Sequence, residues 1–517
     1  MKYFLLFLLL FISSIFSTTP AQRVGLVLSG GGARGITHIG VIQALEENHI
    51  PIDYITGTSM GAIVGAMYAM GHSTQEIIRI LKSDDFKRWS TGELDPAYNF
   101  YYRVADPKPA VADIHIKINS KDSFSIVPKV LPPNLVPPHQ MNFAFIQLFA
   151  PATAYINGDF KKLFVPFRSV ASDIYNKEAV VFRNGDLGDA VRTSMTFPFV
   201  FKPIKVDNRL LFDGGIFNNF PLDVMVDDFK PDYIIGSAVS NNPPKPTEDD
   251  VFRQLETMIM NKTDYSLNGH NGTLLKFDLE SYMLFDFSKV DELVKIGYDS
   301  TIAHIEEIRR AIRRRVTTAD VNERRAAFRD NLPDLNFKNI YITGVDSLQK
   351  AYVDRSFHKS DEEFGFDEFK NGYFNLISDD KISEVLPKAI YNKNNKTFDL
   401  HLNVKTEDQL KVLIGGNVSS TTANQAFFGL VYQDLREYGH TAHIDAQFGR
   451  MYNGLSVGSR TDLPMDNIYT KLTGVYHRFN YFDEQRLFFD DDITANFSQN
   501  ELYANLSLGM PLTLPGC

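Results

Sequence analysis

A serine between two glycines, at a predicted corner between strand and helix, is the first feature of this sequence that could do chemistry. In DYITGTSMGAIVGAMYAMG, residues 53–71, the apolar run up to Ser59 predicts a strand, and the small and apolar residues after it predict a helix. Gly57 and Gly61 complete the pattern G-x-S-x-G around Ser59. In this context the pattern is typical of an exposed serine nucleophile. A tight turn that merely needs small residues is the alternative.

A glycine-rich loop precedes the serine. SGGGARG, Ser29–Gly35, follows a predicted buried strand and opens a predicted helix. Consecutive glycines let backbone amides approach an anion closely, and the helix N-terminus adds positive potential, so the loop suits an oxyanion or a phosphate. For Arg34 the sequence leaves three roles open: support of the loop, contact with a phosphate, or a structural surface arginine. The candidate oxyanion residues are Gly30, Gly31, Gly32, Arg34 and Gly35.

Nucleotide binding is a weaker interpretation of the same loop. Gly30, Gly32 and Gly35 satisfy G-x-G-x-x-G, but a dinucleotide site also needs an acidic residue at the end of the next strand. Asp53 has the required spacing, yet it stands at the start of its strand. No Gly-Lys-Ser/Thr follows the glycines, which excludes a P-loop.

A third segment, FDGGIFNNFP, places Asp213 at the end of a predicted strand and before the bend Gly214–Gly215. Taken alone, an aspartate at a turn is more often a capping residue than a catalytic one.

The three segments together resemble the patatin-like phospholipase family. That family has a G-G-G-x-R-G loop, a G-x-S-x-G elbow and a D-G-G/A motif in this order, matched here by Gly30–Gly35, Gly57–Gly61 and Asp213–Gly215. DAVRTSMTFPFVFKPI, residues 189–204, also resembles the family's segment before the aspartate. The resemblance covers roughly residues 23–240. It implies hydrolysis of carboxylic esters of phospholipids or lysophospholipids, with Ser59 as nucleophile, Asp213 as proton acceptor, glycine-loop amides as oxyanion hole, and no cofactor.

An aspartate with a pKa near 3.9 is a weak base at neutral pH, so this dyad requires burial to raise the pKa of Asp213. A Ser–His–Asp triad is the rival arrangement. His270 and His304 follow Asp213 in the order that an α/β-hydrolase would need, but neither stands in a recognisable loop motif. His38 lies near the glycine loop, where a core or helix-surface role is the simpler interpretation.

The elements that must position these residues belong to a chain of 517 residues, long enough for two to four domains. It has 44% hydrophobic and 22% charged residues, typical of a folded protein, and its net charge of −10 gives no support for nucleic acid as a partner. Cys517 is the single cysteine, which excludes an internal disulfide. The apolar N-terminus predicts a signal peptide over residues 1–21, with an uncleaved anchor as the alternative.

Residues 22–328 alternate strand and helix patterns, which predicts an α/β fold: a three-layer α/β/α domain with a mostly parallel sheet. Its last part, residues 302–328, predicts one long charged helix. The arginines of that helix either touch anionic lipid headgroups or form a solvated face.

Residues 332–406 predict a small α+β module with the order β-α-α-β-β, which resembles a POTRA domain. Residues 408–517 alternate apolar and polar residues with frequent aromatics, typical of outer-membrane strands. About six strands fit there, fewer than the 8 of the smallest such barrels, so we expect an incomplete barrel; a soluble β domain is the alternative.

These patterns predict a lipid hydrolase exported across the inner membrane and associated with the outer membrane. Its hydrolase domain would be periplasmic or surface-exposed, and the sequence leaves a homodimer open. The alternative is a non-catalytic outer-membrane assembly or secretion factor that carries the patatin-like domain as a passenger.

Overall fold

The computed structural model describes residues 22–98, 106–118, 124–128, 134–242, 245–357, 363–418, 424–449, 451–463, 468–482 and 496–510. The predicted signal peptide lies outside these residues. The chain divides into two compact units: residues 1–91 with 147–333, and residues 92–146 with 334–517. The hydrolase region expected over residues 22–328 is therefore interrupted, because residues 92–146 group with the C-terminal part of the chain.

The first unit is built on an eight-stranded sheet with the order β10-β9-β1-β2-β5-β8-β7, and β6 pairs with β5 beside this path. The pairs β1/β2, β1/β9, β9/β10 and β2/β5 are parallel, whereas β8 runs antiparallel to β5 and β7. The strands are β1 (Val24–Leu28), β2 (Tyr54–Thr58), β5 (Phe167–Asp173), β6 (Glu178–Phe182), β7 (Ile204–Val206), β8 (Arg209–Asp213), β9 (Tyr233–Ala238) and β10 (Gly272–Lys276).

Helices cover both faces of this sheet. Adjacent residues of a strand point to opposite faces. On β2, Tyr54 stacks on Phe229 of α8, while Ile55 lies against Gly65 of α3. The expected α/β/α layering follows from these contacts. The helices of the unit are α2 (Thr37–Glu47), α3 (Met60–Ala69), α4 (Thr74–Leu81), α5 (Asp84–Thr91), α7 (Leu187–Ser194), α8 (Leu222–Phe229), α9 (Val251–Ile259), α10 (Val290–Ala311) and α11 (Thr318–Arg329). Helix α6 (His139–Ile156) contains the change of unit at Gln147.

The single charged helix expected over residues 302–328 is wrong. Helix α10 ends at Ala311, where Ile312 is extended, and α11 begins after Thr317, whose side chain caps it in a capping box with Asp320. The guanidinium of Arg315 donates to carbonyls at the end of α10, including that of Arg309. The sequence pattern missed the break because its apolar spacing continues through Ile312 and Val316 while the capping chemistry stops the helix.

The second unit contains a module with the predicted order β-α-α-β-β: β11 (Phe337–Thr343), α12 (Ser347–Arg355), α13 (Phe366–Ile377), β12 (Ile382–Asn392) and β13 (Thr397–Thr406). Its strand order is β11-β13-β12, with β11 parallel and β12 antiparallel to β13.

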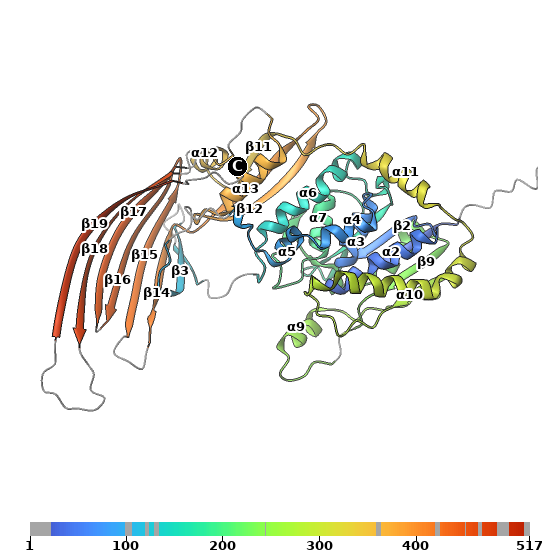
Figure 1. Cartoon of the computed structure of the whole chain (residues 1–517), viewed down its shortest axis with the longest axis horizontal. Helices are drawn as coiled ribbons and strands as arrows, with labels where there is room; N and C mark the ends of the chain where they lie inside the picture. The colour runs from blue at the N-terminus through green and yellow to red at the C-terminus, as the bar shows by residue number, and fades with distance from the viewer. Residues whose placement is uncertain are drawn as a thin grey trace, which may run out of the picture. The chain divides into compact units, whose positions relative to one another are not determined.

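An antiparallel sheet with the order β19-β18-β17-β16-β15-β14-β3-β4 completes the unit (Figure 1). Six of its strands come from the C-terminal region, as predicted; the hairpin β3–β4 comes from residues 110–128 and was not expected. The strands are β3 (Ala110–Ile118), β4 (Phe124–Pro128), β14 (Leu410–Asn417), β15 (Gln425–Leu435), β16 (Gly439–Gly449), β17 (Tyr452–Leu463), β18 (Ile468–Phe482) and β19 (Asn496–Gly509). Among the described residues, no helix is long and apolar enough to cross a bilayer.

Candidate active site

Ser59 occupies a strained corner between β2 and α3. Its φ of 54° and ψ of −122° are unusual for a residue other than glycine. Its backbone amide donates to the hydroxyl of Ser194 at 2.9 Å, and that hydroxyl donates to the Val170 carbonyl at 2.5 Å. Ser194 therefore fixes the corner from α7 and β5. The Ser59 side chain stays half-buried and within reach of a ligand.

Asp213 ends β8 and faces Ser59. The Ser59 hydroxyl donates to Asp213 Oδ2 at 2.7 Å, and the Gly215 amide donates to Oδ1 at 2.7 Å. Only 6% of Asp213 is exposed, and this burial raises the pKa of its carboxyl to about 6, against the lowering effect of the two hydrogen bonds. The two residues are 154 positions apart in the sequence, and the sheet brings their side chains into direct contact.

Side-chain hydroxyls of β2 hold the segment that follows Asp213. Thr58 donates to the Asn218 carbonyl at 2.9 Å, and Thr56 donates to the Pro221 carbonyl at 3.0 Å. These bonds set the register between the corner that carries Ser59 and the bend at Gly214.

The glycine loop packs directly against the Ser59 corner. A Cβ on Gly30 would lie 3.0 Å from Cβ of Ser59, and a Cβ on Gly35 would lie 2.6 Å from Cβ of Met60. The Gly30 amide donates to the Asn219 carbonyl at 3.1 Å, and the Arg34 amide to the Gly31 carbonyl at 3.2 Å. Among the described residues, the amides of Gly31 and Gly32 donate to no protein acceptor.

The side chain of Arg34 holds a neighbouring loop. Its Nε donates to the Tyr282 carbonyl at 2.9 Å, and its Nη2 to the Glu280 carbonyl at 3.3 Å. Of the three roles that the sequence left open for Arg34, these bonds favour support of the glycine loop, because they tie that loop to the segment that contains Glu280 and Tyr282. Asp53 is structural too: its carboxylate accepts the Val24 amide at 2.7 Å and pairs with Arg314.

Sequence reasoning missed two buried groups at this site. Asn219 accepts the Gly30 amide through its carbonyl, and its side-chain amide donates to the Tyr265 hydroxyl at 2.6 Å. Its place six residues after Asp213, in a loop rich in asparagine, is the only local signal for it. Ser194 lies within the segment 189–204 that was singled out, but no residue pattern there distinguishes it.

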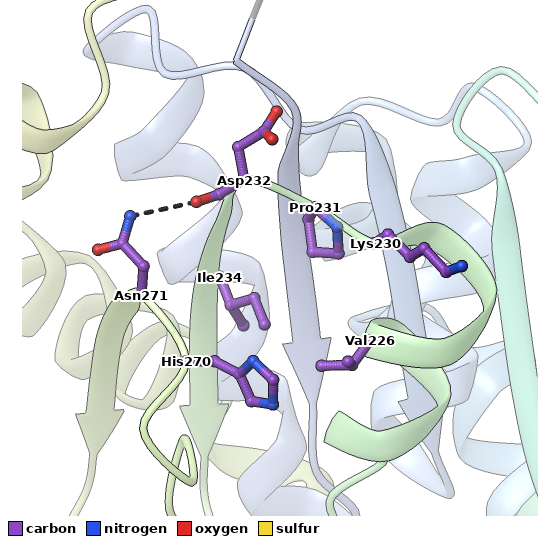
Figure 2. Close-up of a pocket in the computed structure, with 7 residues that line it drawn as sticks. All are labelled: Val226, Lys230, Pro231, Asp232, Ile234, His270 and Asn271. Atoms are coloured by element: carbon purple, nitrogen blue, oxygen red, sulfur yellow. Dashed lines mark hydrogen bonds between the residues drawn. The ribbon is translucent and has the colours of Figure 1, made fainter.

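The structure gives each histidine of the rival triad other surroundings. His38 is buried and bonds Ser237 Oγ at 2.8 Å and the Ser29 carbonyl at 2.9 Å, and His304 bonds the Ser300 carbonyl within α10. His270 lines a cavity of about 220 Å³ beside Asp232 and Asn271, which precede β9 and β10 (Figure 2). That cavity lies at the amino ends of these parallel strands, whereas Ser59 follows the carboxyl end of β2. Within the described ranges, none of the three histidines hydrogen-bonds Ser59 or Asp213.

Residues 26–226 match the family model described as patatin-like phospholipase. An uncharacterized NTE family protein of Mycobacterium tuberculosis is 31% identical over 204 residues, which are 40% of this chain and 46% of that protein. Lysophospholipase NTE1 of Meyerozyma guilliermondii is 26% identical over 305 residues, 54% of this chain and 19% of that protein. The matched regions span less than half the length of these relatives.

Among solved structures, BamA from Haemophilus ducreyi lacking POTRA domains 1-3 is similar with a TM-score of 0.28 and 12% identity, over 35% of this chain and 33% of that chain. A likeness of this size carries no conclusion about the second unit. For the first unit, the match of the family model includes the glycine loop, the serine corner and Asp213 in their predicted order. Residues 26–226 therefore form a patatin-like phospholipase domain.

Proposed function

We propose that this chain is a lipid acyl hydrolase that cleaves carboxylic esters of phospholipids or lysophospholipids through Ser59 and Asp213. One observation carries the proposal: the 2.7 Å hydrogen bond from the Ser59 hydroxyl to a buried carboxylate, at a corner packed against a glycine loop. The phospholipase family model and the lysophospholipase relative support a lipid substrate.

In the first half-reaction, Ser59 Oγ attacks the ester carbonyl carbon while its proton passes to Asp213 Oδ2. A pKa of about 6 leaves this carboxylate ionised at neutral pH yet more basic than a solvated aspartate. Direct contact makes a histidine relay unnecessary. The ester C–O bond then breaks, and the leaving alcohol takes the proton from Asp213.

The negative charge that develops on the carbonyl oxygen requires hydrogen-bond donors. We assign this role to the amides of Gly31 and Gly32, since those of Gly30 and Arg34 already donate to protein carbonyls. In the second half-reaction, water attacks the acyl-enzyme, Asp213 accepts its proton, and the fatty acid leaves as Ser59 is restored.

Labelling with a fluorophosphonate tests this proposal. The purified full chain should be labelled at Ser59, and Ser59→Ala should lose the label and the hydrolysis of lysophospholipid. Ser266→Ala, a serine outside the site, is the matched control and should retain both. A folded wild-type chain that takes no label would overturn the proposal and favour the non-catalytic passenger.

We further propose that the second unit attaches the enzyme to the outer membrane. On β15, exposed Phe428, Leu430 and Tyr432 alternate with buried residues of the other face. Across the sheet Leu430 pairs with Ile444, and Ile444 pairs with Val457, each between 42% and 49% exposed. An apolar face that continues over several strands suits contact with lipid.

The opposite face of this sheet carries buried Phe427, Val431 and Leu435 on β15, and ion pairs elsewhere. Lys108 pairs with Asp445 at 2.8 Å, and His477 lies 2.8 Å from Glu501. Ion pairs on the face opposite the exposed apolar one match the alternation of membrane strands, which place polar residues inside.

Charge substitution on each face tests the attachment. Val457→Lys should sharply reduce flotation of the full chain with phospholipid vesicles, because a lysine within the hydrocarbon region costs about 2–4 kcal/mol. Ser456→Lys, one residue away on the opposite face, should float like wild type. Equal flotation of both variants would contradict this part of the proposal.

A further inference from the structure

The side-chain oxygen of Asn219 lies between the glycine loop and the bend that follows Asp213. A Cβ added to Gly30 would be 2.3 Å from Asn219 Oδ1, and a Cβ added to Gly215 would be 2.7 Å from it. At both positions Oδ1 is nearer than Cγ, so the oxygen is the tip of the side chain that faces the two glycines. A larger residue at either position would displace this oxygen.

The same two positions place Oδ1 beside the dyad. The Cβ that Gly30 lacks would be 3.0 Å from Cβ of Ser59, and the Cβ that Gly215 lacks would be 3.0 Å from Asp213 Oδ1. Each of these two points is thus close both to the Asn219 oxygen and to a member of the dyad. One water molecule can therefore bridge the Asn219 oxygen and the dyad.

Two hydrogen bonds fix Asn219 in this orientation. Its Nδ2 donates to the Tyr265 hydroxyl at 2.6 Å, and its backbone carbonyl accepts the Gly30 amide at 3.1 Å. Among the described residues no group donates to Oδ1, although only 6% of Asn219 is exposed. An amide oxygen is only an acceptor, and a buried acceptor without a protein donor needs a hydrogen bond from water or from a ligand.

We propose that Asn219 Oδ1 binds the water that hydrolyses the acyl-enzyme. This inference rests on the proposed function, because it requires an acyl group on Ser59. One hydrogen of the water is donated to Asp213 Oδ2 and the other to Asn219 Oδ1, which leaves a lone pair of the water oxygen for the acyl carbon.

The proposed step balances as follows. The water oxygen forms a bond to the acyl carbon while one of its protons passes to Asp213. The other proton stays on that oxygen and becomes the hydroxyl hydrogen of the released fatty acid. Asp213 then returns its proton to Ser59 Oγ as the bond between Oγ and the acyl carbon breaks.

This role belongs to the second half-reaction alone. In the first, the transferred proton comes from the Ser59 hydroxyl, which donates to Asp213 directly at 2.7 Å. No water takes part in that transfer. Loss of the Asn219 oxygen should therefore slow deacylation, leave acylation unchanged, and let the acyl-enzyme accumulate.

Rapid-mixing kinetics with p-nitrophenyl butyrate on the full chain separate the two half-reactions. Asn219→Leu keeps a branched side chain but has no acceptor. It should slow hydrolysis of the acyl-enzyme by about 100-fold and leave kcat/KM, which reports acylation, unchanged. p-Nitrophenol should appear in a burst, and mass spectrometry should find the butyryl group on Ser59. Added hydroxylamine, a stronger nucleophile than water, should restore turnover.

Tyr265→Phe gives a second, milder variant. It removes the acceptor of Asn219 Nδ2 and lets the carboxamide turn, so it should slow deacylation by about fivefold, again with kcat/KM unchanged. If Asn219→Leu does not fold, this variant decides. Asn271→Leu is the matched control, because the Asn271 side chain also donates one hydrogen bond, to the Asp232 carbonyl at 3.1 Å, but at the amino ends of the strands. Both of its rates should equal those of wild type.

Two results would overturn the inference. One is a fall of kcat/KM and of the fluorophosphonate labelling rate together with kcat, because Asn219 would then act on acylation or on the fold of the site. The other is deacylation at the wild-type rate in both variants. If wild type is neither labelled by fluorophosphonate nor active on the ester, the proposed function fails, and this inference fails with it.

Discussion

In the proposed reaction, burial of Asp213 determines the pH at which the site can work. Because its pKa is raised to about 6, the carboxylate can accept the proton of Ser59 only above that pH. We therefore predict that kcat/KM for a soluble ester falls about tenfold per pH unit below about pH 6 and is level near neutrality. A pH–rate profile measures this limb directly, and a profile that stays level down to pH 4.5 would rule out Asp213 as the base.

Asp213→Asn adds an independent measurement. The neutral amide cannot accept the proton, so turnover should drop by about 1000-fold or more. A raised carboxyl pKa means that ionisation of Asp213 opposes folding as pH rises through about 6. At pH 8 the asparagine variant should therefore be no less stable than wild type in a thermal melt, and a large fall in its Tm would point to a structural role instead.

We infer that His38 positions the glycine loop. Its Nε2 donates to the Ser29 carbonyl, and the next carbonyl, of Gly30, accepts the hydroxyls of Ser29 and Ser240 at 3.1 and 2.9 Å. Since carbonyl and amide point in opposite directions across a trans peptide, the bond of His38 orients the Gly30 amide, and the two hydroxyls orient the Gly31 amide. We predict that His38→Phe lowers kcat by about 100-fold with little change in KM, and that His38→Gln, which keeps a donor, recovers part of it.

The pH dependence of stability checks the same residue. Burial lowers the pKa of His38 to about 4, so its neutral form stabilises the fold above about pH 6.5, and this stabilisation is lost as pH falls to about 4. The loss amounts to about 3 kcal/mol. In urea titrations at pH 7 and pH 4.5, the free energy of unfolding of His38→Gln should fall less between the two pH values than that of wild type. Unchanged kinetics and an unchanged dependence would contradict the assignment.

At the scale of elements, the glycines of the serine corner allow α3 to begin against β1. A Cβ on Gly61 would lie 2.5 Å from the Leu28 carbonyl oxygen and 2.6 Å from that of Ser29. Both obstacles are backbone atoms, which cannot move without shifting the sheet. Gly61→Ala should therefore destabilise the first unit by about 2 kcal/mol and reduce fluorophosphonate labelling. The matched control is Gly474→Ala in β18, where an added Cβ meets nothing closer than 4.0 Å, so the free energy of unfolding should hardly change. An equal fall in Tm for the two variants would contradict the prediction.

At the scale of the whole molecule, a buried lysine joins two parts of the second unit. Lys381 is 4% exposed and contacts Asp379, Asp380 and Asp462 at 3.1, 2.8 and 2.8 Å. Asp462 belongs to β17, whereas Asp379, Asp380 and Lys381 stand directly before the first residue of β12. These carboxylates raise the pKa of Lys381 despite the opposing effect of burial. The lysine is therefore charged, and its removal leaves the carboxylates without their shared partner.

We predict that Lys381→Met destabilises the second unit by about 3–5 kcal/mol. Lys405→Met is the matched control: Lys405 pairs with Glu384 at 2.7 Å but is 62% exposed at its side chain, so the change should cost less than about 1 kcal/mol. Hydrogen exchange should show faster exchange in β12 and β17 of Lys381→Met alone. Protection equal to wild type would contradict the prediction.

The sequence alone predicted the strands and helices on either side of the glycine loop and of Ser59, the strand that ends at Asp213, and the three segments of the site. A strand shows alternating or continuous apolar residues over a short stretch, and glycines and other turn residues mark its ends. A short stretch of sequence is therefore enough to predict it. The β-α-α-β-β order and the six C-terminal strands were readable for the same reason. The break after Ala311 was not, because capping ended a helix whose apolar spacing continued.

Only the tertiary structure decided which distant groups meet. It placed the Asp213 carboxylate 2.7 Å from the Ser59 hydroxyl. It also placed His38 against the Ser29 carbonyl at the start of the glycine loop, and not at the serine nucleophile. It also paired the hairpin of residues 110–128 with β14, which no local pattern indicates. Such contacts depend on the order of strands and on the burial of side chains from segments far apart in the chain. Periodicity and turn chemistry describe each segment by itself, so they cannot specify its neighbour.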